Sequence, residues 1–188
     1  MKVVGFNGSP RKDGNTAALL GHLFREIELE GIETEMVQLG GKPLRGCIAC
    51  YKCFENRDGR CAVRKDALNT YIEKMVVAAA IILASPSFFQ AVTAEMKALI
   101  DRAGFVGLAN GKMYQDKVGA SLACFRRTGG VHTFETMNHF FLSNDMIVAG
   151  RAMGLARDKG DMDRDAEGIV QAQTLGRRIA RLLRKLHA

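Results

Sequence analysis

The chain alternates between short apolar runs and longer segments whose apolar residues recur at helical spacing. The apolar runs are rich in β-branched residues and show little polar alternation; they read KVVGFN, AAIILASP, DKVGASLAC and DMIVAG. This pattern is typical of strands that are buried on both faces of a parallel sheet. A further strand, ETEMVQL, does alternate, and it follows Gly31, a residue type that often ends a helix.

Helical spacing predicts helices over residues 15–30, 66–77, 93–102, 133–144 and 167–186. Strands and helices therefore alternate along the chain, which favours an α/β fold: a doubly wound parallel sheet of five strands with helices on both faces. Residues 40–65 form an insertion, the Cys-rich loop, between the second strand and the next helix, so we expect its cysteines to belong to a loop at one end of the sheet. A length of 188 residues with 47% hydrophobic residues suits a single domain over residues 1–188.

The formal net charge of +7 is concentrated in GRRIARLLRKLHA at the C-terminus. Apolar residues recur there at helical spacing opposite the basic ones, so we expect an amphipathic helix that packs on the core. Because no nucleic-acid-binding motif accompanies the charge, we expect no nucleic-acid partner. No apolar stretch reaches the length of a membrane span and no signal-like sequence precedes the first strand, so we expect no membrane association and a cytoplasmic location.

Four of the five cysteines stand in the pattern Cys47-x2-Cys50-x2-Cys53-x7-Cys61. In a reducing compartment, closely spaced cysteines serve metal binding or redox chemistry more often than disulfides. Thiolates at this spacing suit an iron–sulfur cluster, zinc, or a free redox-active thiol site. Surrounding basic residues are expected to lower the thiol pKa values; they are Arg45, Lys52, Arg57, Arg60, Arg64 and Lys65. Cys124 stands apart, and we expect it to be a small buried residue.

The first strand is followed by GSPRKDGNT, which leads into a helix. Exposed N–H groups at a helix start, together with small hydroxyl residues and one arginine, suit a phosphate monoester. The loop has neither the G-x-G-x-x-G pattern nor a P-loop lysine, which disfavours a dinucleotide or a nucleoside triphosphate. The structural alternative is an ordinary strand-to-helix turn with an Asn or Thr cap.

GSPRKDGNT closely resembles the FMN phosphate loop of the NADPH-dependent FMN reductase branch of the flavodoxin-like superfamily. SPSFFQAVTAEMKALIDR and CFRRTGG resemble that family's second and third flavin loops. The resemblance implies a flavodoxin-like strand order of 2-1-3-4-5, with FMN at the point where the order reverses. It also implies which residues bind the cofactor: Ser9, Arg11, Asn15 and Thr16 in the first loop, Pro86, Ser87, Phe88 and Phe89 in the second, and Ala123, Arg127, Thr128, Gly129 and Gly130 in the third.

The cysteine spacing is similar to the cluster motif of the iron-sulfur flavoproteins within the same superfamily. This similarity implies that Cys47, Cys50, Cys53 and Cys61 hold a [4Fe–4S] cluster close to FMN. Relatives with similar Cys-rich loops can lack a cluster, so zinc and free thiols stay open as alternatives.

The predicted function is an FMN-dependent oxidoreductase or electron-transfer flavoprotein of the FMN reductase type. It passes electrons between NAD(P)H or a ferredoxin-like donor and an unknown acceptor. No protein side chain is predicted to be catalytic, because the isoalloxazine carries the chemistry. The alternatives are a cluster-free NAD(P)H-dependent flavin or quinone reductase and a non-catalytic thiol or metal redox-sensing module. The resemblance also implies a homodimer or homotetramer; VHTFETMNHFFLSNDMIV is either part of that interface or an ordinary core helix.

Overall fold

A computed structural model describes all 188 residues, and a parallel sheet of five strands forms its centre. The strand order is β2-β1-β3-β4-β5, with every neighbouring pair parallel. The strands are β1 (Lys2–Asn7), β2 (Glu33–Gln38), β3 (Ala80–Pro86), β4 (Val118–Phe125) and β5 (Ile147–Leu155). The predicted fold class and strand order are therefore confirmed.

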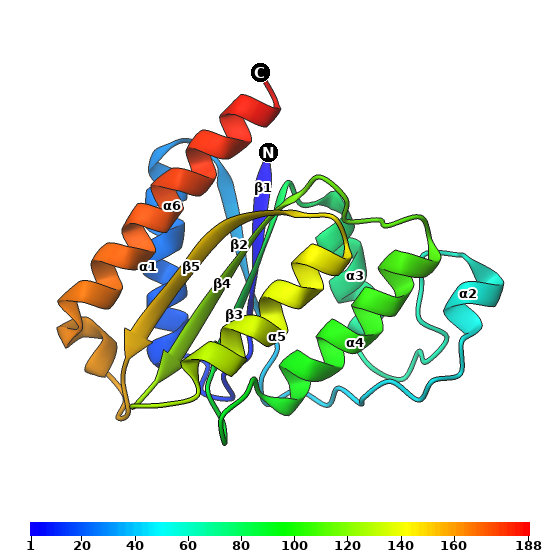
Figure 1. The fold of residues 1–188 in the computed structure, drawn as a ribbon, viewed down its shortest axis with the longest axis horizontal. Helices are drawn as coiled ribbons and strands as arrows, with labels where there is room; N and C mark the ends of the chain where they lie inside the picture. The colour runs from blue at the N-terminus through cyan, green and yellow to red at the C-terminus, as the bar shows by residue number, and fades with distance from the viewer.

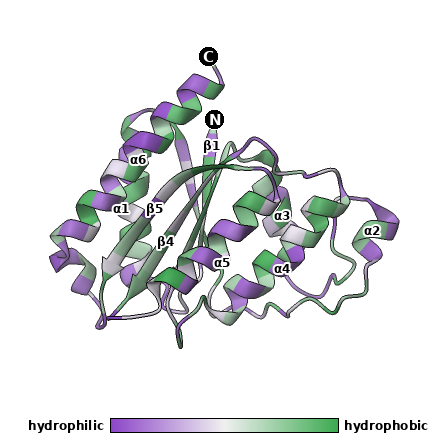
Figure 2. Ribbon diagram, in the orientation of Figure 1, coloured by the Kyte–Doolittle hydropathy of each residue, from purple (hydrophilic) through white to green (hydrophobic).

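Helices cover both faces of the sheet (Figure 1). One face carries α1 (Asn15–Leu29) and α6 (Ala166–Leu186), and the other carries α3 (Leu68–Val77), α4 (Ala94–Ala109) and α5 (Gly130–Ser143). An apolar cluster lies between the sheet and the helices on each of its two faces. Figure 2 shows the hydrophobic strands between the two layers of helices. The central strands β1, β3 and β4 are buried along both faces and are therefore largely apolar, whereas the edge strands β2 and β5 are only partly buried.

Most predicted boundaries agree with the structure to within three residues, and two do not. α4 continues past Arg102 to Ala109, because Ala103 and Val106 extend its buried stripe before Asn110 and the left-handed Gly111 end it. β5 continues past Gly150 to Leu155, because the chain forms a bulge there and then resumes pairing with β4.

Two short elements were not predicted: α2 (Lys52–Asn56) within the Cys-rich loop and the 3₁₀ turn η1 (Asp161–Arg164) before α6. α6 itself is amphipathic as expected, with Leu175, Ile179 and Leu183 buried. No helix is both long enough and apolar enough to cross a membrane.

The strand order reverses at β1, which has β2 on one side and β3 on the other. The chain leaves β1 towards α1 on one face and leaves β3 towards α4 on the opposite face, so a crevice forms between the two exits. Three loops meet at this edge: loop one (residues 8–14), loop two (87–93) and loop three (126–129). Figure 1 shows them below the arrowheads of the strands, at the end of the sheet opposite both termini.

Candidate functional site

Loop one ends at a helix terminus that has no capping side chain. Gly14 occupies the N-cap of α1, and the first turn of α1 contains no acidic residue. The first N–H groups of this helix lack intrahelical acceptors, so they are free to bind an anion. Arg11 is exposed and makes no ion pair, while the buried Ser9 accepts a hydrogen bond on Oγ from the Arg11 N–H at 3.2 Å.

The side chains of Asn15 and Thr16 are engaged in other contacts. The Asn15 amide donates to the Asp158 carbonyl at 2.8 Å and accepts from the Met162 N–H at 3.2 Å. Thr16 is buried beside the Cys124 thiol. At these two predicted phosphate-binding positions, it is therefore the backbone N–H groups that are free at the start of α1.

Buried hydrogen bonds hold the backbone of loop one in place. The Asn7 carboxamide accepts from the Ser9 N–H and donates to Gln38, and Gln38 donates to the carbonyls of Ser9 and Gly40 at 2.7 Å each. From the other side, the Thr93 hydroxyl donates to the Gly8 carbonyl at 2.9 Å. Loop one is thus tied to β1, β2 and the start of α4, which gives it a fixed shape without a ligand.

Loop two is a tight reversal that projects aromatic side chains into solvent. The Phe88 and Ala91 backbones pair as an antiparallel bridge, and the two central residues, Phe89 and Gln90, both have positive φ values of 46° and 78°. Such a turn normally carries Asn or Gly, so two larger residues there are strained. Phe89 is fully exposed and Phe88 is half exposed. An exposed ring on a strained turn suits contact with a planar ligand.

Loop three packs directly on loop two. Gln90 donates to the Thr128 hydroxyl at 3.0 Å, and a Cβ on Gly129 would stand 2.1 Å from the Ser87 Oγ. Arg127 and Thr128 are exposed, and Gly130 begins α5. Pro86 ends β3, while the Ala123 side chain is fully buried in the core and its strand position pairs with Ser85 and Met153. The structure thus brings together loops two and three, with Ala123 the least accessible of the predicted contacts.

The Cys-rich loop starts at the sheet edge but turns away from it. Its cysteines pack against the middle of α4, beside Arg102 and Phe105, and Figure 1 shows α2 projecting at the side of the molecule. Arg102 lies eight residues beyond Ala94, so it is about 12 Å along the helix from the carboxyl edge of the sheet. The expectation that the cysteines belong to a loop at the end of the sheet is therefore met only where that loop begins.

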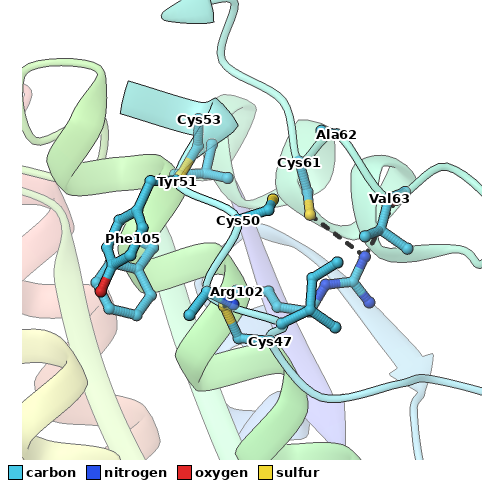
Figure 3. A pocket seen from close by; sticks show the side chains of 12 residues that line it. Cys47, Cys50, Tyr51, Cys53, Cys61, Ala62, Val63, Arg102 and Phe105 are labelled. Atoms are coloured by element: carbon cyan, nitrogen blue, oxygen red, sulfur yellow. Dashed lines mark hydrogen bonds between the residues drawn. The ribbon is translucent and has the colours of Figure 1, made fainter. Parts of the chain in front are cut away.

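Cys47, Cys50, Cys53 and Cys61 line a single cavity of about 30 Å³ (Figure 3). Ala49 and Tyr51, the residues flanking Cys50, have positive φ values of 50° and 53°. Alternating left-handed residues turn successive N–H groups towards one side, a geometry found around phosphates and iron–sulfur centres. The Ala49 N–H donates to the Cys47 sulfur at 3.4 Å.

The donor set fits a sulfur-ligated metal centre in its chemistry and in its common cavity. No group of three or more His, Cys, Asp or Glu side chains stands at mutual ligand positions, and all five cysteines are free thiols. A space of about 30 Å³ holds one or two water molecules, so binding a cluster requires the loop to expand. Such rearrangement is common, because metal binding and folding of the site are coupled.

The surrounding basic residues do not lower the pKa of Cys53, contrary to expectation. Burial raises the pKa of the Cys53 thiol, and the neighbouring Cys61 and Cys47 add to that rise. Arg60 and Arg64 instead pair with Glu73 and Asp58 at the surface. Cys124 is buried as expected, and burial raises the pKa of its thiol to about 12.

The sequence pattern did not reveal several residues that shape the carboxyl edge of the sheet and the Cys-rich loop. Asn7, Gln38 and Thr93 lie at strand ends or a helix start, and each reads by itself as an ordinary polar residue. The buried pair of Arg102 and Asp66 connects positions that are far apart in the chain. The only available signal was their placement at the carboxyl ends of strands or next to the cysteines.

The profile of the NADPH-dependent FMN reductase family matches residues 1–159. The chain belongs to this family. Membership identifies it as an FMN-dependent oxidoreductase, and loops one, two and three lie within the matched residues.

Relatives of the chain include an iron-sulfur flavoprotein of Methanocaldococcus jannaschii, which is 36% identical over 98% of each chain. An iron-sulfur flavoprotein of Archaeoglobus fulgidus is 31% identical, covering 96% of this chain and 79% of the relative. Among solved structures, RosB with a bound formylriboflavin phosphate intermediate superposes with a TM-score of 0.78 at 20% identity, over 100% of this chain and 80% of RosB. The last comparison supports the fold.

Proposed function

We propose that this FMN-dependent oxidoreductase passes electrons between FMN and a [4Fe–4S] cluster held by Cys47, Cys50, Cys53 and Cys61. The observation that carries the proposal is the gathering of all four cysteines around one cavity, in a chain whose relatives are named iron-sulfur flavoproteins. FMN exchanges either a hydride or single electrons, and a [4Fe–4S] cluster exchanges single electrons, so the two suit each other as partners.

The protein's part in this function is binding and orientation. The N–H groups at the start of α1, with Ser9 and Arg11, are proposed to hold the FMN phosphate. The aromatic turn of loop two and the glycine-rich loop three are proposed to flank the isoalloxazine ring. The pre-shaped backbone of loop one lowers the entropy lost when the cofactor binds.

NAD(P)H or a ferredoxin-like protein is the proposed electron donor. Beside loop three lies a hollow of about 590 Å³ whose lining includes Arg127, His132 and Arg151. The Arg151 guanidinium stacks over the Phe134 ring at 4.9 Å, leaving a cationic surface next to the proposed flavin position. Such a lining suits the phosphates of a nicotinamide cofactor. We further propose that the chain assembles as a homodimer or homotetramer, which light scattering tests.

The second candidate is a cluster-free NAD(P)H-dependent flavin or quinone reductase. It is favoured by one observation: the four sulfurs do not stand at mutual ligand positions. The thiol loop would then be a redox-active site in its own right. A non-catalytic sensor fits less well, because family membership supports an oxidoreductase.

Purification without oxygen, followed by an absorption spectrum and iron and sulfide assays, separates the two candidates. We expect one FMN and about four iron and four sulfide per chain. Flavin with no iron or sulfide would reject the cluster. Anaerobic mixing with NADH, NADPH or a reduced ferredoxin then identifies the donor, and no flavin reduction by either nicotinamide would reject the reductase candidate.

A further inference from the structure

Arg102 is the one fully buried arginine in the structure, and it lies against the cysteine cavity. Its side chain is 1% exposed. The guanidinium donates to both carboxylate oxygens of Asp66, at 2.5 and 3.1 Å, and Asp66 is itself 7% exposed. Asp66 is the only carboxylate that pairs with Arg102. The Nε atom of Arg102 has no hydrogen-bond partner.

The remaining acceptors of Arg102 lie on the two arms of the Cys-rich loop, which are the segment before Cys47 and the segment that begins at Cys61. The guanidinium donates to the Arg45 carbonyl at 3.0 Å before the first cysteine, and to the Val63 carbonyl at 3.1 Å after the last. It also donates to the Cys61 sulfur at 3.4 Å, as the dashed lines in Figure 3 show. Only a planar fork with several donors reaches acceptors in so many directions. One side chain therefore closes the loop around its cavity.

The same contact places a positive charge beside the sulfur atoms. The Arg102 guanidinium keeps its positive charge, because arginine is not deprotonated in proteins and the buried Asp66 carboxylate pairs with it. Electrostatic interactions weaken least where water is excluded. Arg64, an arginine of the Cys-rich loop itself, is exposed, so solvent and salt screen its charge.

We propose that Arg102 is a positioning residue of the four-cysteine site: it clasps the loop through both arms, and its charge raises the reduction potential of the sulfur-ligated centre. The inference rests on the proposed cluster and goes beyond it, because it assigns a tuning role to a residue outside the ligand set. Reduction adds one electron and so one negative charge to the centre. A buried cation in contact with a ligand sulfur stabilises that added charge.

The test compares Arg102→Lys, Arg102→Gln and the matched control Arg64→Gln as anaerobically purified holoproteins. Arg64→Gln removes an equal charge, but from an exposed site in the Cys-rich loop where the arginine pairs with Asp58 and not with a cysteine. The readouts are iron and sulfide per chain and the midpoint potential of the iron–sulfur signal by electron paramagnetic resonance. FMN content serves as the check on folding.

We expect Arg102→Gln to lower the midpoint potential and to reduce iron retention at least twofold. In Arg102→Lys, the midpoint potential should stay close to that of the wild type while the iron content falls, since lysine preserves the charge but not the planar set of donors. Arg64→Gln should match the wild type in both. An unchanged potential in Arg102→Gln would overturn the tuning role.

If Arg102→Gln does not fold, the double variant Arg102→Met with Asp66→Asn is measured in its place. This variant leaves no unpaired buried charge, so folding is restored more readily. Its potential is again expected below that of Arg64→Gln, and equality would overturn the proposal.

Absence of iron and sulfide in the wild type would reject the proposed cluster and, with it, the effect on the potential. The clasp is then judged on the iron-free protein with iodoacetamide and peptide mass spectrometry. We expect the alkylation rate of Cys61 relative to Cys50 to rise several-fold in Arg102→Gln, because the loop opens. An unchanged ratio would overturn the clasp independently of the cluster.

Discussion

The carboxyl edge of the sheet is held by side-chain hydrogen bonds from Asn7, Gln38 and Thr93, made to one another or to the backbone carbonyls of loop one. In the Cys-rich loop, the buried side chain of Arg102 instead joins the two ends of the loop. At the edge, each contact joins elements that the core already fixes. In the Cys-rich loop, none of the residues from 41 to 63 is fully buried. The edge, where FMN is proposed to bind, therefore has a fixed shape, while the Cys-rich loop has few buried contacts that resist rearrangement around a metal centre.

The largest loss of folding stability is expected when the buried ion pair that supports the Cys-rich loop is broken. Asp66→Asn leaves the Arg102 charge buried without its counter-ion, which should destabilise the protein by about 3–5 kcal/mol. Burial would raise the pKa of Asp66, but its contacts with Arg102 outweigh burial and lower it. Asp66 therefore stabilises the fold above its unfolded pKa of about 3.9, and this stability is lost as the pH falls through the lower folded value.

Urea unfolding of the wild type and the variant at several pH values between 7 and 3 (roughly, across the range where carboxylates titrate) measures both effects. The variant should lose less stability on acidification than the wild type. Asp58→Asn is the matched control, because Asp58 pairs with Arg64 at the surface; it should cost about 0–1 kcal/mol. Equal costs for the two variants would contradict the assigned importance of the buried pair.

An intermediate effect tests the fixed shape of the carboxyl edge. In Gly40→Ala, the new Cβ would stand 2.3 Å from the Gly8 carbonyl oxygen and from the Ser9 carbonyl carbon. Both are backbone atoms of loop one, so the loop must shift. We expect a cost of about 1–3 kcal/mol in stability and a rise of about tenfold or more in the FMN dissociation constant, equivalent to about 1.4 kcal/mol. Fluorescence titration of the apoprotein with FMN measures the second effect.

The control for this prediction is Gly21→Ala, in the middle of α1, where no atom lies within 4 Å of the new Cβ. Alanine is the better helix former, so this variant should gain up to about 1 kcal/mol and bind FMN normally. Normal FMN affinity in Gly40→Ala would show that the edge adapts as readily as the Cys-rich loop.

The smallest expected effect on stability belongs to the exposed ring of loop two. Phe89→Ala should change the free energy of unfolding by no more than about 0.5 kcal/mol, because the side chain is fully exposed. If the ring stacks on the flavin, the FMN dissociation constant should rise about two- to tenfold, corresponding to about 0.5–1.5 kcal/mol. The matched control is Leu29→Ala, an exposed apolar residue at the end of α1. Equal FMN affinities in the two variants would remove Phe89 from the proposed flavin site.

The sequence by itself determined the order of elements, the fold class and the local features of both regions. Short apolar runs that are rich in β-branched residues and lack alternation are typical of strands buried on both faces of a sheet, so this local pattern predicts the strands. The small and hydroxyl residues of loop one and the cysteine spacing are likewise local, because neighbouring residues suffice to define a helix start or a ligand motif.

Only the tertiary structure decided how these regions are supported and where they lie. Gln38 reaches loop one 29 positions away, and Arg102 reaches Asp66 and Arg45 over 36 and 57 positions. No local pattern encodes such pairs, since a polar residue at a strand end or on a helix is equally compatible with solvent. The turn of the Cys-rich loop towards the middle of α4 also depends on such distant pairs. The buried Arg102 guanidinium needs hydrogen-bond acceptors, and the carbonyls on both arms of the loop supply them.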